Sequence, residues 1–200
     1  MAIVIDYYLT PISPWAYLGA AAFAEIAAEA RAEVRVKPVH FGPVLKEGGG
    51  LPLPQRAPAR QAYRLQELKR WRKHRQIPLT LHPAYFPCPD VLASHFILAA
   101  EAIGGDPLRL AQAIGKAVWE EERNVADTGT LQDIAQETGH DRITILAKAI
   151  EPTMETRMEE LTQEALQKGV FGAPSYVVGE ELFWGQDRLP LLREFLKEAA

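Results

Sequence analysis

The order in which strand-like and helix-like segments follow one another is the feature that most limits the possible folds of this chain. Residues 2–9 (AIVIDYYL) and 32–41 (AEVRVKPVHF) are short, apolar and rich in β-branched or aromatic residues, as buried strands are. Residues 14–31 between them are rich in alanine and repeat apolar residues at helical spacing. Strand, helix and strand in this order predict a βαβ unit with parallel strands and a right-handed crossover.

The strand pattern returns only near the end of the chain. Residues 175–179 (SYVVG) and 181–185 (ELFWG) predict two strands joined by a tight connection at Gly179–Glu180, and the amphipathic segment DRLPLLREFLKEAA follows them. The residues between the two strand regions are mostly helical in pattern, whereas the Gly- and Pro-rich residues 42–58 predict a loop. Helices are expected at 58–75, 90–103, 107–123, 130–138, 142–149 and 152–168.

A βαβ half and a ββα half that share one small sheet make a thioredoxin-like α/β fold. We therefore predict a thioredoxin-like domain from residues 1–42 and 169–200, with residues 43–168 as a large all-helical insertion domain. A Rossmann arrangement needs more alternating strands and a glycine fingerprint after the first strand. The glycines at 48–50 lack that strand–turn–helix context.

The composition argues against several classes of protein. The net charge is −4, whereas a general nucleic-acid binder is usually basic, and the basic segment 64–76 (RLQELKRWRKHRQ) is better read as a solvated helix face. No apolar run approaches the roughly 20 residues that span a bilayer, and the N-terminus lacks the features of a signal peptide. We expect a soluble cytoplasmic protein with neither a nucleic-acid nor a membrane partner.

The cysteine and histidine content limits the chemistry further. The single cysteine, Cys88, excludes an internal disulfide and fits a reducing compartment. The five histidines show no HxxxH or HExxH spacing, so no metal site is expected.

The turn after the first strand carries the sequence Ser13-Pro14-Trp15-Ala16. In a thioredoxin-like fold a Cys-X-X-Cys motif usually occupies this turn, because the N-terminus of the helix stabilises a thiolate. Without sulfur here, the chain cannot carry out dithiol chemistry alone, and a thiol that reacts at this turn must come from a ligand, with Ser13 donating a hydrogen bond to it. The alternative is that Ser13 is only an N-cap, since Ser followed by Pro is a common helix start.

Two segments near the C-terminus could complete a ligand site. In GVFGAPSYVV (169–178), a cis Ala173–Pro174 bond before the strand would expose the Ala173 N–H and C=O to an extended peptide. Asp187, expected at the N-cap of the last helix, is either a cap or a carboxylate for a ligand ammonium group. Its neighbours Gln186 and Arg188 could bind ligand carboxylates.

Five segments in this order resemble the family of 2-hydroxychromene-2-carboxylate isomerases and kappa-class glutathione transferases, whose fold is like that of DsbA-type disulfide oxidoreductases. They are SPWAYLG (13–19), LKRWRKHRQIPL (68–79), HPAYFP (82–87), GVFGAPSYVV (169–178) and WGQDRL (184–189). The resemblance covers essentially the whole chain and favours the functional interpretation of Ser13.

The resemblance implies a glutathione site along the thioredoxin-like edge, with the glutathione sulfur near Ser13. Ala173, before Pro174, would pair with the cysteinyl backbone of glutathione, and Asp187 would hold the γ-glutamyl end. The remaining glutathione contacts implied are Arg60, Gln186 and Arg188.

In the isomerases of this family, the glutathione thiolate adds to an unsaturated cyclic 2-hydroxy acid. The ring then opens, a bond rotates, and the thiolate departs to give the trans open-chain pyruvate. This chemistry needs an apolar pocket for a small aromatic substrate. The wall candidates are Trp15, Tyr85, Phe86 and Trp184, although an aromatic residue taken singly is more often an ordinary part of the core. The resemblance also implies a homodimer. Two alternatives stay open, a glutathione transferase or peroxidase that uses the same thiolate, and a non-catalytic thioredoxin-fold protein.

Overall fold

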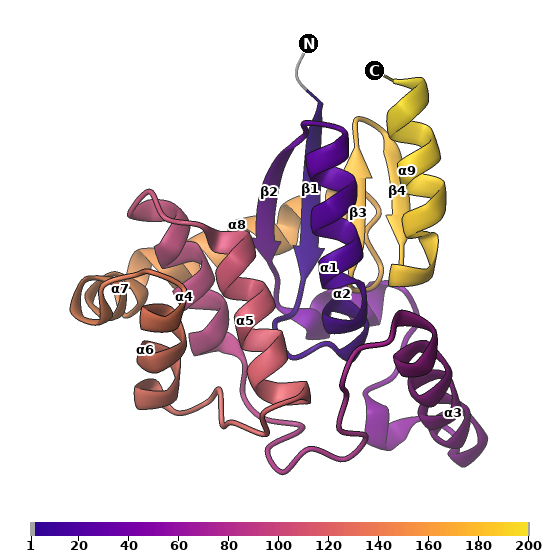
Figure 1. Ribbon diagram of the computed structural model, residues 1–200, viewed down its shortest axis with the longest axis horizontal. Coiled ribbons are helices and arrows are strands. Elements are labelled where there is room, and N and C mark those ends of the chain that lie inside the picture. The colour runs from indigo at the N-terminus through magenta and orange to yellow at the C-terminus, as the bar shows by residue number, and fades with distance from the viewer. Residues whose placement is uncertain (1–2, 200) are drawn as a thin grey trace.

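A four-stranded sheet lies at the centre of the computed structural model, which describes residues 3–199 (Figure 1). Its strands are β1 (Val4–Leu9), β2 (Glu33–Pro38), β3 (Ser175–Val178) and β4 (Glu181–Trp184), in the order β2-β1-β3-β4. β1 pairs with β2 in parallel and with β3 antiparallel, and β3 pairs antiparallel with β4. The predicted parallel pairing and the predicted thioredoxin-like combination of the two halves are confirmed.

Helices cover both faces of this sheet. α1 (Pro14–Glu29) connects β1 to β2 and packs beside α9 (Leu189–Glu198) on the face toward the viewer in Figure 1. α8 (Pro152–Gln167) contacts β2 and lies behind the sheet in the same view. Because α1 begins at Pro14, shortly after β1 ends at Leu9, its N-terminus lies at the carboxyl end of β1.

The helical segment agrees with the sequence prediction except at its start and at the end of α5, which stops at Trp119 instead of continuing to residue 123. Its remaining helices are α2 (Phe41–Glu47), α3 (Pro58–Arg75), α4 (Val91–Ala102), α5 (Pro107–Trp119), α6 (Thr128–Glu137) and α7 (Arg142–Ala149), with a short 3-10 turn η1 (Leu53–Gln55). The prediction of a loop across 42–58 is wrong for α2. Pro43 is tolerated in the first helical turn, and the fully buried Val44 anchors the helix.

Aspartates fix the starts of three helices in this segment. Asp106, Asp127 and Asp141 precede α5, α6 and α7, and each carboxylate accepts a hydrogen bond from the backbone N–H three residues later, at 2.9, 2.8 and 2.8 Å. These contacts satisfy donors that the helix itself leaves free, which explains why each helix begins where it does.

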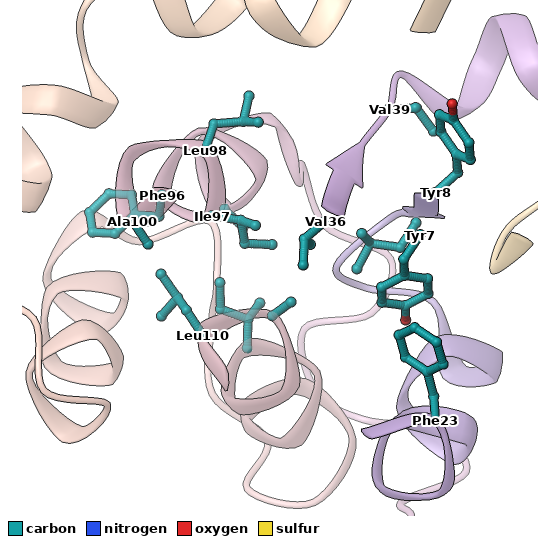
Figure 2. Close-up of a cluster of buried hydrophobic side chains, with 14 of the residues drawn as sticks. Tyr7, Tyr8, Phe23, Val36, Val39, Phe96, Ile97, Leu98, Ala100 and Leu110 are labelled. Atoms are coloured by element: carbon teal, nitrogen blue, oxygen red, sulfur yellow. The ribbon is translucent and has the colours of Figure 1, made fainter. Parts of the chain in front are cut away.

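One cluster of buried apolar side chains joins the sheet to the helical segment. Figure 2 shows Val36 of β2 beside Ile97 of α4, and Tyr7 of β1 next to Phe23 of α1. The rings of Tyr7 and Phe23 have centroids 4.7 Å apart, and the Tyr7 ring also stacks on Tyr176 of β3 at 5.1 Å. The division into domains at residues 42–43 and 168–169 stays a prediction.

Helix α3 is the least anchored of the long helices. Leu68 is its only residue that is buried in the part of the chain the structure describes, and most of its other side chains are charged or polar. It packs against α1 and ends at Gln76, which adopts a left-handed conformation with φ of +55°. In Figure 1 it stands below the sheet on the right, apart from α4–α7. None of the helices within residues 3–199 is long and apolar enough to cross a bilayer.

Candidate functional site

A cavity of about 550 Å³ lies between α3, the start of α1, the segment before β3 and the segment at and after the end of β4. This volume falls in the range of small-molecule sites, about 300–1,000 Å³. The predicted site residues that line it are Trp15, Arg60, Ala173, Trp184, Gln186, Asp187 and Arg188. These residues come from three distant parts of the sequence, and the fold brings them to one place.

Ser13 stands at the N-cap of α1, on the edge of this site. Its Oγ accepts a hydrogen bond from the Ala16 N–H at 3.3 Å, and Pro14 occupies the first helical turn. The structure gives the Ser13 hydroxyl proton no acceptor among residues 3–199, and the Trp15 N–H likewise has none there. Ser13 itself is partly exposed and is not a lining residue, but Trp15, two positions later, is. The turn therefore presents two free donors at the positive end of a helix dipole.

The peptide bond between Ala173 and Pro174 is cis, as predicted. The Pro174 carbonyl accepts a hydrogen bond from the Gly185 N–H at 2.9 Å, whereas Ala173 makes no hydrogen bond through its N–H or C=O within the described residues. Gly172, just before it, has no room for a β-carbon because the indole of Trp184 lies against its backbone. The unpaired backbone of Ala173 is thus open to an extended peptide ligand.

Gln186 is held by a residue that the sequence did not single out. Arg75, in the last turn of α3, donates to the Gln186 Oε1 from Nη2 at 3.0 Å and from Nε at 3.2 Å, and to its carbonyl oxygen at 3.1 Å. Gln186 is only 2% exposed. Its side-chain oxygen is therefore engaged, which leaves its amide NH₂ as the group that can face a ligand carboxylate. The sequence prediction treated the basic residues of α3 as a solvated helix face, so it did not identify this role of Arg75.

Asp187 lies in the 3-10 turn η2 (Gln186–Arg188), and the prediction that it caps the last helix is wrong. Arg188 is the N-cap of α9, without a side-chain cap hydrogen bond, because η2 runs directly into α9. The Asp187 carboxylate instead accepts from Arg188 Nη1 at 2.8 Å, and both side chains are about half exposed at the cavity. A carboxylate has about four acceptor sites, so beside this one hydrogen bond Asp187 can still accept from an ammonium group.

Tyr85 and Phe86, predicted as walls of the substrate pocket, are not among the residues that line the cavity. Tyr85 is 47% exposed and Phe86 is partly buried. The Phe86 ring packs on Trp119 with centroids 4.6 Å apart, and the guanidinium of Arg64 lies 5.6 Å from the Phe86 centroid. Phe86 therefore contacts Arg64, a residue that does line the cavity.

Helix α3 supplies residues to the cavity that sequence reasoning missed. They are Ala59, Tyr63, Arg64, Glu67 and Trp71, with Arg56 just before the helix. Positions 60, 64, 67 and 71 are three or four residues apart, so they share one helical face, a spacing that could have revealed them. Burial, with the nearby charge of Arg56, lowers the pKa of Arg64 to about 10.

Across residues 3–199 no group of three or more His, Cys, Asp or Glu side chains is arranged to hold a metal ion.

Comparison with known proteins gives a consistent result. Residues 4–197 match the family described as DSBA-like thioredoxin domain. The chain is 27% identical to a 2-hydroxychromene-2-carboxylate isomerase of Sphingobium xenophagum over 98% of this chain and 99% of that one. It is 25% identical to glutathione S-transferase kappa 1 of Caenorhabditis elegans over 97% of this chain and 91% of that one. A solved 2-hydroxychromene-2-carboxylate isomerase superposes with a TM-score of 0.81 at 23% identity, covering 98% of this chain and 95% of that one.

Proposed function

The chain belongs to the DSBA-like thioredoxin domain family, and from this premise we propose that it is a glutathione-dependent enzyme. The specific activity we propose is the isomerisation of 2-hydroxychromene-2-carboxylate to trans-o-hydroxybenzylidenepyruvate in the breakdown of aromatic compounds. One observation carries the proposal, namely that a sulfur-free helix start and the unpaired backbone of Ala173 meet at one cavity. The isomerases and the kappa-class transferase among the relatives of the chain support it.

The cavity fits the chemical groups of glutathione. The unpaired N–H and C=O of Ala173 match the two backbone groups of an extended cysteinyl residue. Asp187 can receive the γ-glutamyl ammonium group, with the Gln186 amide and Arg188 beside it for the adjacent carboxylate. Arg60 lines the cavity from α3 and can pair with the glycyl carboxylate.

The hemiketal ring of the substrate would open as its C–O bond breaks, with the hydroxyl proton passing to the departing phenol oxygen and a keto group left behind. The glutathione thiolate would bond to the double-bond carbon next to the aromatic ring while the electron pair of that bond moves onto the keto oxygen. The resulting single bond would rotate, and return of the electron pair would expel the same thiolate. Ser13 would donate its hydroxyl proton as a hydrogen bond to the sulfur, and the free N–H of Trp15 would add a second donor. These donors and the positive end of α1 favour the thiolate over the thiol. The indoles of Trp15, Trp71 and Trp184 provide apolar wall for a flat substrate.

Binding of glutathione is the first test. A ligand at 100 times its dissociation constant stabilises the folded state by about 2.7 kcal/mol, so millimolar glutathione should raise the unfolding temperature by several degrees. Ophthalmic acid, in which a methyl group replaces the thiol, is the matched ligand for the contacts that do not involve sulfur. Absence of any stabilisation by either tripeptide would favour the alternative of a non-catalytic thioredoxin-fold protein.

Turnover separates the two kinds of enzyme. We expect the protein, with glutathione, to convert 2-hydroxychromene-2-carboxylate faster than it conjugates 1-chloro-2,4-dinitrobenzene. The opposite preference would indicate a transferase of the kappa class. We also propose that the protein acts in the cytoplasm, where glutathione is kept reduced. We further propose that it is a homodimer, which light scattering after size-exclusion chromatography tests.

A further inference from the structure

Arg64 is a cation in the cavity without a polar partner. Its side chain makes no hydrogen bond or ion pair within residues 3–199, although it is only partly exposed and lines the cavity. Its contact is with an aromatic ring, since its guanidinium carbon lies 5.6 Å from the centroid of Phe86. A guanidinium that stacks on a ring keeps its N–H donors free in its own plane, ready for a flat anion.

Except for Arg60, the other charged side chains of the cavity are already engaged. Asp187 pairs with Arg188 at 2.8 Å, and Glu67 pairs with Arg70 of the same helix. Arg56 donates from Nε to the Leu51 carbonyl oxygen at 2.8 Å. The cavity therefore holds an excess of positive charge in a chain whose net charge is −4.

Glutathione accounts for only part of this positive charge. Its two carboxylates and one ammonium group are matched, in the proposed function, by Arg60, Arg188 and Asp187 with the Gln186 amide. Arg64 is left over, and Arg56 lies close enough for its charge to lower the Arg64 pKa. An unmatched cation that is partly removed from water is most easily stabilised by a second anionic ligand.

A series of side-chain contacts connects Arg64 to the turn at Ser13, near which the glutathione sulfur would lie. Phe86, beneath Arg64, packs on Trp119 with centroids 4.6 Å apart. The Trp119 Nε1 donates to the Ile12 carbonyl oxygen at 3.1 Å, and Ile12 directly precedes Ser13. Trp119 is fully buried, so this connection lies in the packed interior. Arg64 is thus linked through packed side chains to the turn that carries Ser13 as well as to α3.

We propose that Arg64 is a specificity-determining residue that binds the carboxylate of the second substrate and thereby selects anionic aromatic acids over neutral aromatic compounds. The inference rests on the proposed function only in taking this cavity as the substrate site. The guanidinium would donate two parallel hydrogen bonds to the carboxylate, a geometry that Arg offers and Lys does not. The tryptophans of the cavity would contact the attached ring.

A binding experiment without glutathione tests Arg64 directly. Isothermal titration calorimetry would measure the affinities of 2-naphthoate and of its neutral isostere 2-naphthamide. We expect the wild-type protein to prefer the carboxylate, and Arg64→Met to weaken binding of 2-naphthoate about tenfold or more while changing that of 2-naphthamide less than threefold. Lys69→Met removes an exposed positive charge from the same helix and should change neither affinity.

Three results would overturn the inference. They are unchanged binding of 2-naphthoate by Arg64→Met, an equal loss for the carboxylate and the amide, and no binding of either compound by the wild-type protein. Should Arg64→Met not fold, Arg64→Lys serves instead, with an expected loss of about threefold to tenfold for the carboxylate alone.

The same variants separate this inference from the proposed function. If glutathione does not bind but 2-naphthoate depends on Arg64, the proposed function fails and the anion site stands. If glutathione binds equally well to the wild type and Arg64→Met, while only 2-hydroxychromene-2-carboxylate turnover falls, both stand. If Arg64→Met loses glutathione affinity instead, Arg64 belongs to the tripeptide site and the inference is wrong.

Discussion

Arg75 joins the C-terminal end of α3 to Gln186, a residue 111 positions later in the chain, through both oxygens of that glutamine. This contact matters because α3 has little apolar anchoring of its own, with Leu68 as its buried residue among those described. One wall of the cavity is α3, and another is the turn that carries Gln186 and Asp187. Arg75 therefore sets the distance between the two walls.

Replacing Arg75 by Met should weaken glutathione binding about tenfold, because the turn that presents Asp187 would lose its attachment to α3. The turnover number at saturating glutathione should change less than threefold, since Arg75 does not contact the reacting atoms. Calorimetric titration and steady-state kinetics measure the two effects. Lys73→Met, an exposed cation in the same helical turn, is the matched control. A fall in the turnover number with unchanged affinity would contradict a positioning role.

Ser13 has both a structural and a proposed chemical role, and two alanine variants can separate them. Ser13→Ala should cost about 1 kcal/mol of stability through the lost N-cap. It should also lower turnover about tenfold to a hundredfold and raise the pKa of the bound thiol, followed by thiolate absorbance near 240 nm. Asp106→Ala removes the N-cap of α5, where Asp106 accepts from the Arg109 N–H at 2.9 Å. It should cost similar stability and leave turnover unchanged. If Ser13→Ala kept the same turnover as Asp106→Ala and the wild type, Ser13 would act only as a helix cap.

The fold was predictable because its signals are local. Each strand and most helices show their own periodicity, and aspartates such as Asp106 stand directly before the helices they cap. The exception is α2, because Gly42 and Pro43 in its first turn look like loop residues. Only the tertiary contacts that bury Val44 make that segment a helix.

The site was predictable only in part. The Ser13 turn and the Ala173–Pro174 segment have short motifs, and the structure places both at one cavity edge. The contact from Arg75 to Gln186 has no local signal, since it depends on how a distant helix packs. The prediction that Asp187 caps the last helix failed because Gly185, with φ of +97°, precedes a 3-10 turn. The spacing of apolar residues in the sequence gives no signal for this turn.

Gly172 offers a test of the peptide edge. Gly172→Ala would place a β-carbon against the Trp184 indole, closer than van der Waals contact allows. The indole or the Ala173 backbone must then move, so glutathione affinity should fall about fivefold to tenfold with a smaller change in stability. Tryptophan fluorescence should report the displaced indole. Gly42→Ala, where a β-carbon meets nothing within 4 Å, is the control and should be neutral or slightly stabilising. An unchanged affinity in Gly172→Ala would show that this edge does not bind the tripeptide.

A buried ion cluster between the sheet and α8 should make stability depend on acid pH. Lys37 lies 2.8 Å from Asp6 and 2.6 Å from Glu164, and Lys168 lies 2.5 Å from Asp6. Burial alone would raise the pKa of the Asp6 carboxyl, but Lys168 and Lys37 outweigh it and lower that pKa below its ordinary value. The pKa of Glu164 is lowered in the same way against its burial, by Lys37 and the hydroxyl of Tyr8.

The sign of the effect follows from these lowered pKa values. Each carboxyl contributes stability above its unfolded pKa of about 4, and that contribution is lost as pH falls through the folded pKa. Urea unfolding should therefore show the free energy of unfolding falling from pH 5 to pH 3. Asp6→Asn should cost about 3 kcal/mol at pH 7, because it leaves the buried Lys37 short of a partner, and should flatten this pH dependence. Glu33→Gln, in an exposed pair with Arg35 at 2.7 Å, should cost less than about 1 kcal/mol and keep the slope. A slope in Asp6→Asn as steep as in the wild type would show that the cluster does not govern acid stability.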